Sequence, residues 1–190
     1  MTADRILEAS EGVLRRYGPA KATVVDVARE LGVSHGSVYR YFHSKAALRD
    51  AVAERWLASV SEPLAEVANA EGPAPERLRD WLGMLAASKR ERARDDPELF
   101  ATYVQIAGES REVITEHVSS LVDQLARIIA NGIAQGEFDV AEPHRAARAV
   151  FDATSRFHDP ANAASWSDPE IATDYEHVQS LVLAGLRRSR

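Results

Sequence analysis

Residues 23–45 constrain the fold more than any other part of the sequence. Thr23 is followed three residues later by Asp26, which is the pattern of a helix N-cap, and we expect a short helix over residues 24–31. Ser34 begins a second short helix that reaches residue 41 or 42. Two short helices separated by Gly-Val-Ser make a helix-turn-helix pattern.

Helical spacing continues through the rest of the 190 residues, because apolar residues recur three and four positions apart and do not alternate. The sequence therefore predicts an all-α fold of about nine helices. Pro63 should kink or divide the fourth helix, and residues 159–165 should form a loop. The expected helices end at Tyr17 for the first and then span residues 24–31, 34–42, 45–69, 76–92, 97–107, 110–136, 142–158 and 169–186.

The exposed side of the helix-turn-helix pattern has an unusual composition. A solvated helical hairpin in an ordinary all-α core, the simplest alternative, would carry Glu and Lys where this chain has Ser-His-Gly-Ser and two tyrosines. Short polar side chains at a helix start can approach base edges, and hydroxyl and ammonium groups can contact phosphates. The candidate DNA-binding residues are Thr23, Ser34, His35, Gly36, Ser37, Tyr39, Arg40, Tyr41 and Lys45.

Charge is unevenly divided along the chain. The formal net charge is −6, but residues 1–50 carry eight basic and six acidic residues, whereas the other 140 carry fifteen and twenty-three. A mildly basic first part beside an acidic remainder suggests two parts with different partners.

A set of short motifs runs from Ile6 to Val52: Tyr17-Gly18, residues 23–28 (TVVDVA), 31–34 (LGVS), 36–42 (GSVYRYF) and 44–48 (SKAAL). With these motifs the segment resembles the DNA-binding domain of tetracycline-repressor (TetR) family regulators. It implies a three-helix helix-turn-helix domain at residues 1–46, followed by a ligand-binding and dimerisation domain at residues 47–190. It further implies a homodimeric repressor that binds a palindromic operator on double-stranded DNA and is released by a small hydrophobic effector.

The resemblance also assigns roles within the first domain. Thr23 caps the second helix and touches phosphate, the segment from Ser34 to Arg40 belongs to the recognition helix, and Tyr39, Tyr41 and Lys45 clamp the DNA backbone. His35, Gly36 and Arg40 are the best candidates for contact with base edges. Ala22 and Val25 depart from the family pattern, because many relatives have polar residues there, so operator affinity should depend more on the recognition helix.

The sequence of the larger second domain contains fewer patterns that indicate function. By analogy with the family, helices four to seven surround the effector cavity; the alternative for each candidate is an ordinary core position. The candidate ligand-binding residues are Trp81, Leu85, Phe100, Tyr103, Val104, His117, Leu121, Phe151 and Phe157. His158 and Asp159 are adjacent, not three or four residues apart as two metal ligands on one helical face would be, so we expect neither a metal nor another cofactor.

Two C-terminal helices are candidates for the dimer interface, because small residues there would let helices approach closely. The apolar positions concerned are Ala147, Val150, Phe151, Thr154, Val178, Leu181, Val182 and Leu186. A palindromic operator requires such a two-fold dimer. By linkage, an effector that moves the helix after Lys45 would weaken operator binding, and that helix is the expected coupling element.

Other function classes receive little support. The chain has no cysteine, no Gly-rich phosphate loop and neither an H-E-x-x-H nor a G-x-S-x-G motif, so we expect no enzyme. It has no apolar run long enough to span a membrane and no secretory signal pattern, so we expect a cytoplasmic protein. The alternatives to a repressor are an activator and a helical protein-interaction module without specific operator binding.

Overall fold

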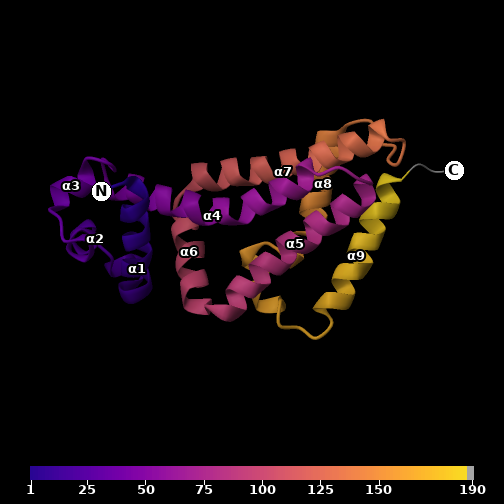
Figure 1. Cartoon of the computed structure of the whole chain (residues 1–190). Coiled ribbons are helices and arrows are strands. Elements are labelled where there is room, and N and C mark those ends of the chain that lie inside the picture. Colours follow the sequence, from indigo (N-terminus) through magenta and orange to yellow (C-terminus); the bar gives the residue numbers. More distant parts are fainter. Residues whose placement is uncertain (188–190) are drawn as a thin grey trace. The chain divides into compact units, whose positions relative to one another are not determined.

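The computed structural model describes residues 1–187, which form nine α-helices and two 3-10 helices with no strand (Figure 1). The chain divides into two compact units, residues 1–59 with 95–117 and residues 60–94 with 118–190. Helices α4 (Lys45–Asn69) and α7 (Arg111–Ala134) each contribute to both units. The expected all-α architecture is therefore confirmed.

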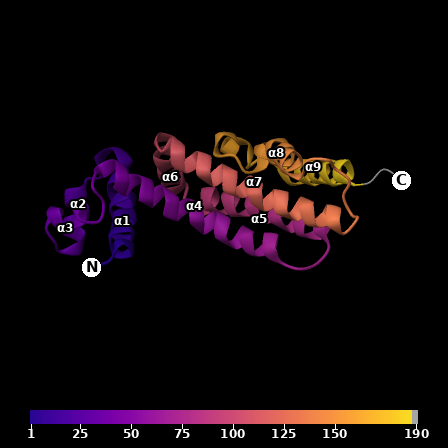
Figure 2. The ribbon, with the colours of Figure 1, turned by 90° about the horizontal axis from the view of Figure 1, so that it is seen from above.

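The first unit contains α1 (Ala3–Lys21), α2 (Val24–Leu31), α3 (His35–Tyr39) and α6 (Pro97–Glu109), with the first parts of α4 and α7. Figure 2 shows α2 and α3 together beside α1. Gly18 has a φ of 72°, so the last turn of α1 restarts at Pro19, at the stop that the sequence predicts. Trp56 of α4 stacks on Tyr103 of α6, with ring centroids 4.9 Å apart.

Ion pairs join the helices of the first unit. Arg55 of α4 lies 3.3 to 3.7 Å from the carboxylates of Asp4, Glu8 and Glu11 on α1. Arg49 of α4 pairs with Glu109 at the end of α6. These ion pairs connect α4 to both α1 and α6.

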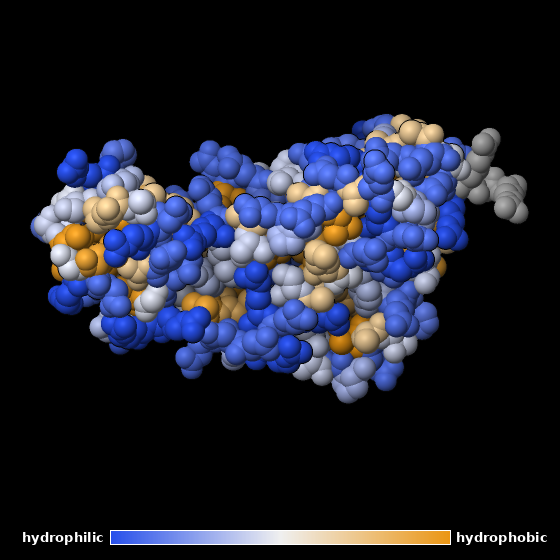
Figure 3. Space-filling view, viewed as in Figure 1, coloured by the Kyte–Doolittle hydropathy of each residue, from blue (hydrophilic) through white to orange (hydrophobic). Residues whose placement is uncertain are grey.

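The second unit contains α5 (Ala74–Asp95), α8 (Pro143–Ala153), the 3-10 helices η1 (Ser155–Phe157) and η2 (Pro160–Ser165), α9 (Ile171–Leu186) and the remaining parts of α4 and α7. Its main core is an apolar cluster from α4, α5, α7, α8 and α9, and a smaller cluster forms around Phe157. Gly132 of α7 lies against Phe138, where a Cβ would come within 2.3 Å of the ring. In the space-filling view most of the visible surface is hydrophilic, interrupted by small hydrophobic areas (Figure 3).

Several local expectations differ from the structure. Helix α4 continues through Pro63 without a break, so the proline does not divide the helix. The predicted loop after residue 159 contains η2, which starts at a proline and is capped by the Asp159 carboxylate, an acceptor for the Ala161 N–H at 2.9 Å. Helix α3, the expected recognition helix, ends at Tyr39, earlier than the sequence predicts, although the N–H groups of Tyr41 and Phe42 still donate to the Val38 carbonyl.

The predicted dimer-interface positions differ in their burial. Ala147, Val150, Thr154 and Leu186 are buried within the chain's own second unit and contribute to its packing. Leu181 on α9, by contrast, is 73% exposed. Of the eight positions, it is therefore the one most available to a second subunit.

Candidate nucleic-acid interface

The start of α2 is fixed by a reciprocal capping box between Thr23 and Asp26. The Thr23 side chain accepts a hydrogen bond from the Asp26 N–H at 3.2 Å, and the Asp26 carboxylate accepts from the Thr23 N–H at 3.2 Å. The Thr23 hydroxyl also donates to the same carboxylate at 2.6 Å, and this bond holds the pKa of Asp26 below its usual value. The capping that the sequence predicts for Thr23 is present.

The start of α3 is capped by Ser34. Its hydroxyl accepts from the Ser37 N–H at 3.3 Å and lies 2.9 Å from the Ser37 hydroxyl. His35 and Gly36, the next two residues, are exposed. A Cβ on Gly36 would meet only the Ser34 hydroxyl, at 3.8 Å. The beginning of α3 therefore presents short polar groups and open space, the surface that close approach to base edges requires.

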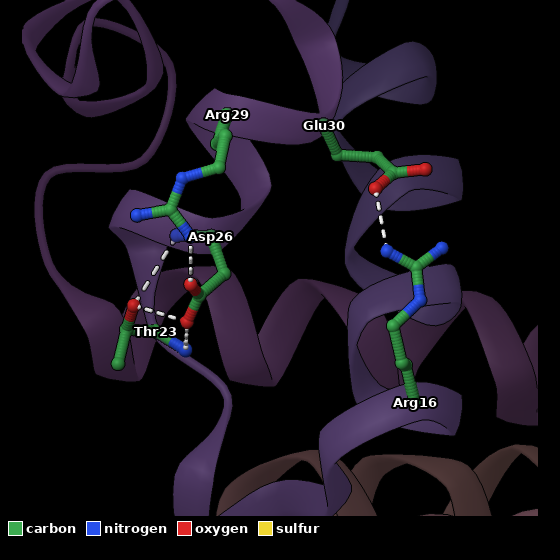
Figure 4. A network of polar contacts seen from close by, with 5 residues as sticks. All are labelled: Arg16, Thr23, Asp26, Arg29 and Glu30. Atoms are coloured by element: carbon green, nitrogen blue, oxygen red, sulfur yellow. Dashed lines mark hydrogen bonds and ion pairs between the residues drawn. The ribbon is translucent and has the colours of Figure 1, made fainter.

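Acidic charge in residues 23–45 is fully paired. The two acidic residues of this segment are Asp26 and Glu30. Asp26 binds Arg29 at 2.9 Å, and Glu30 binds Arg16 of α1 at 3.0 Å (Figure 4). No carboxylate in this segment is therefore left unpaired to repel a phosphate.

Two basic side chains of the same segment remain available. Arg40 and Lys45 are exposed, and within residues 1–187 neither side chain forms a hydrogen bond or an ion pair. A cation without a carboxylate partner can displace the counterions of a polyanion, so these two side chains are available to bind one.

The two tyrosines differ in what their hydroxyls do. Tyr41 donates to the Met1 carbonyl at 2.6 Å, so its proton is already engaged within the chain. Tyr39 is 39% exposed and packs edge-on against His35, with ring centroids 6.3 Å apart. Within residues 1–187 its hydroxyl makes no hydrogen bond. Tyr39 is the tyrosine whose hydroxyl can donate to a ligand without first breaking an internal bond.

The predicted ligand-binding residues fall in both units. Phe100, Tyr103, Val104 and His117 belong to the first unit, and the other five belong to the second. Trp81, Leu85 and Leu121 are buried in the large core cluster, where the Trp81 indole donates to Gln124 at 2.9 Å.

An open groove of about 690 Å³ lies on the second unit between α5 and α9. Arg79, Arg90, Tyr175 and Gln179 contribute to its walls, and none of the nine predicted residues lines it.

Sequence reasoning missed the charged groups buried in the second unit. Arg77 of α5 is buried and donates to the carbonyls of Val67 and Ala68 at the end of α4. Lys89, farther along α5, is 5% exposed, and burial lowers its pKa to about 8. No periodic pattern marks these positions, because a cation on a largely polar helix usually faces solvent.

His158 is also buried, and it has a structural role different from the helix-end interaction usual for a histidine. Its ring lies 4.6 Å from the Phe151 ring, and its Nε2 lies 3.2 Å from the Phe151 carbonyl and 3.3 Å from the Thr154 hydroxyl. Burial lowers the pKa of His158 to about 4, so the ring is neutral at pH 7.

Within residues 1–187 no cluster of His, Asp or Glu has a metal-binding arrangement, and no helix is both long and apolar enough to cross a bilayer.

Comparison with known proteins identifies relatives of both parts of the chain. The family model described as "Bacterial regulatory proteins, tetR family" matches residues 6–52. A second model, "Tetracyclin repressor-like, C-terminal domain", matches residues 74–179, which is more than half of the chain.

Individual relatives agree with this match. An uncharacterised HTH-type transcriptional regulator of Mycobacterium tuberculosis, Rv1255c, is 32% identical over 134 residues, which span 66% of this chain and 63% of that protein. The structure of SmeT, the repressor of the Stenotrophomonas maltophilia multidrug efflux pump SmeDEF, has a TM-score of 0.70 at 20% identity over 100% of this chain and 92% of SmeT. A SmeT–triclosan complex aligns with a TM-score of 0.68 at 18% identity over 98% and 92% of the respective chains.

Proposed function

The chain belongs to the TetR family of bacterial regulatory proteins, and from this premise we propose that it is a ligand-responsive transcriptional repressor. In this proposal a homodimer binds a palindromic operator through α2, α3 and the start of α4, in the compartment that holds the chromosome. The supporting observation is electrostatic: both acids of residues 23–45 are paired, whereas Arg40 and Lys45 are exposed and unpaired within the described chain.

The contacts divide into two kinds in this proposal. Lys45, Tyr39 and the hydroxyls at the start of α3 bind phosphates and set the register, whereas His35, Gly36 and Arg40 face base edges. Because the hydroxyl proton of Tyr41 is engaged by Met1, Tyr41 donates to DNA only if that bond breaks.

The effector part of the proposal rests on the second family match and on the SmeT complex. Triclosan bound to SmeT is a small molecule held by a protein of this fold. The nine aromatic, apolar and histidine positions named above remain our proposed effector contacts in this chain. They suit a hydrophobic or amphipathic compound, because apolar pockets favour such ligands.

The dimer part follows from the operator. A two-fold dimer reads two half-sites about 34 to 36 Å apart, or a multiple of that spacing. The exposed Leu181 on α9 is the first side chain to examine at such an interface, since it is 73% exposed in the single chain.

Selection of random duplex DNA by the purified protein, followed by sequencing, tests the proposal. We expect a palindrome to be recovered, and we expect its binding to be reduced by the effector. Recovery of only weak, salt-sensitive and sequence-independent binding would contradict operator recognition and favour a protein-interaction module. An effector that binds without changing operator affinity would contradict the coupling between the two sites.

A further inference from the structure

The donors of Thr23 are all used inside α2. Its hydroxyl has one proton, which goes to the Asp26 carboxylate at 2.6 Å, and its N–H points to the same oxygen at 3.2 Å. A phosphate oxygen can only accept hydrogen bonds. In this arrangement Thr23 therefore has no donor left for a phosphate, although the sequence marks it as a phosphate contact.

The other oxygen of Asp26 holds the guanidinium of Arg29 at 2.9 Å (Figure 4). This is the one hydrogen bond that the Arg29 side chain makes within residues 1–187, and that side chain is 73% exposed. A guanidinium has five N–H donors in a planar fork. Arg29 therefore keeps most of its donors for a second acceptor while Asp26 fixes its position.

The neighbouring acid does not compete for this guanidinium. Glu30 binds Arg16 of α1 at 3.0 Å, a separate pair in the same view (Figure 4). Helical side chains lean toward the helix N-terminus, which brings Arg29 over the first turn of α2 beside Thr23. Thr23, Asp26 and Arg29 thus form a continuous chain of hydrogen bonds that ends in an exposed cation.

We propose that Arg29 makes the DNA-phosphate contact at the start of α2, and that Thr23 and Asp26 are positioning residues that hold its guanidinium. The inference rests on the proposed DNA-binding function and deepens it. A guanidinium can bind a carboxylate with one edge and a phosphate with another, so Arg29 also screens the phosphate from Asp26. Without Arg29, the Asp26 carboxylate would face the same phosphate unpaired.

The salt dependence of DNA binding tests this contact. The probe is a labelled duplex of arbitrary sequence, about 30 base pairs long, because a phosphate contact is independent of sequence. Affinity is measured between about 50 and about 200 mM salt. For Arg29→Gln we expect a slope of log affinity against log salt that is smaller by about 0.9, and an affinity about three- to tenfold lower at the low-salt end.

Arg16→Gln is the matched control, because it removes another exposed, acid-paired arginine of the same unit. It should leave the slope unchanged, and Arg29→Lys should restore most of the slope because it keeps the charge. Equal slopes for Arg29→Gln and Arg16→Gln, with normal binding by the wild-type protein, would overturn the inference and leave the proposed function intact. A wild-type protein that binds no duplex would overturn both.

A double-mutant cycle tests the positioning role of Thr23. Thr23→Val keeps the shape of the side chain but removes the hydroxyl that holds Asp26. If Thr23 acts through Arg29, Thr23→Val lowers affinity in the wild-type background and changes it less than about twofold in the Arg29→Gln background. Equal losses in both backgrounds would show that Thr23 acts independently, either as its own DNA contact or through the stability of α2.

Discussion

The two units of the chain differ in where their basic side chains lie. In residues 23–45 of the first unit, the acids are paired and Arg40 and Lys45 are exposed without a partner among the described residues. In the second unit, Arg77 and Lys89 are buried. An exposed cation stabilises a complex with a polyanion, whereas a buried cation affects the free energy of folding. Substitutions in the first group should therefore change binding, and those in the second should change stability.

Gly132→Ala should have the largest effect, on the stability of the second unit. The new methyl group would lie 2.3 Å from the Phe138 ring and 2.8 Å from the Ala74 side chain. Because a packed core resists added volume, we expect a loss of about 3 kcal/mol in the free energy of unfolding. Urea denaturation measures this. Gly12→Ala on α1, where nothing lies within 4 Å, is the control and should be neutral or slightly stabilising.

Lys89→Met should stabilise the protein at pH 7. The fall of the lysine pKa from 10.5 to about 8 reflects the cost of burying the ammonium group. Below pH 8 the folded chain bears this cost in full, and the cost disappears as pH rises through 8 toward 10.5. We expect a gain of about 1 to 3 kcal/mol near pH 7 that shrinks above pH 8.

Urea denaturation of wild type and variant across this pH range measures the difference. Lys21→Met, which removes an exposed lysine, provides the comparison. A Lys89→Met variant that is less stable than the wild type at pH 7 would show that the ammonium group has favourable partners that outweigh its desolvation.

Arg40→Ala and Lys45→Ala should separate base recognition from phosphate binding. Loss of a base contact by Arg40 should cost about 1 to 3 kcal/mol on the selected operator and little on random DNA. Lys45→Ala should weaken binding to both and reduce the salt slope by about one. Titration of each variant against both duplexes measures the difference. Equal losses on the two duplexes for Arg40→Ala would remove its role in base recognition.

The sequence predicts the first unit well because local signals determine it. Thr23, Asp26 and Gly32 mark the ends of α2, and the structure has the helix at those bounds with Gly32 at a φ of 66°. The same signals do not show hydrogen-bond direction. The pairing of Arg29 with Asp26 could be suspected from its spacing of three residues. That Thr23 gives its proton to Asp26 is visible only in the structure.

Long-range packing explains what the sequence does not predict in the second unit. Lys89 lies in a run of charged residues, and nothing in that run indicates that this one faces inward. Pro63 has the strongest helix-breaking propensity of any residue type, yet α4 continues through it. Tertiary contacts stabilise most helices in proteins more than local propensity does, and they can compensate for one lost hydrogen bond.

Gly36→Ala should have the smallest effect on stability, because Gly36, unlike Gly132, has open space where a side chain would lie. A Cβ at Gly36 would meet only the Ser34 hydroxyl, at 3.8 Å, so α3 can accept it. Alanine also favours helix, and we expect a change in unfolding free energy within about 1 kcal/mol.

If α3 approaches base edges at this point, the methyl group should reduce operator affinity about tenfold and leave random-DNA affinity unchanged, because it fills space that the bases need. Urea denaturation and titration with the two duplexes give both values. Unchanged operator affinity would show that the start of α3 does not come within contact distance of the bases, and base recognition would then depend on Arg40 and His35.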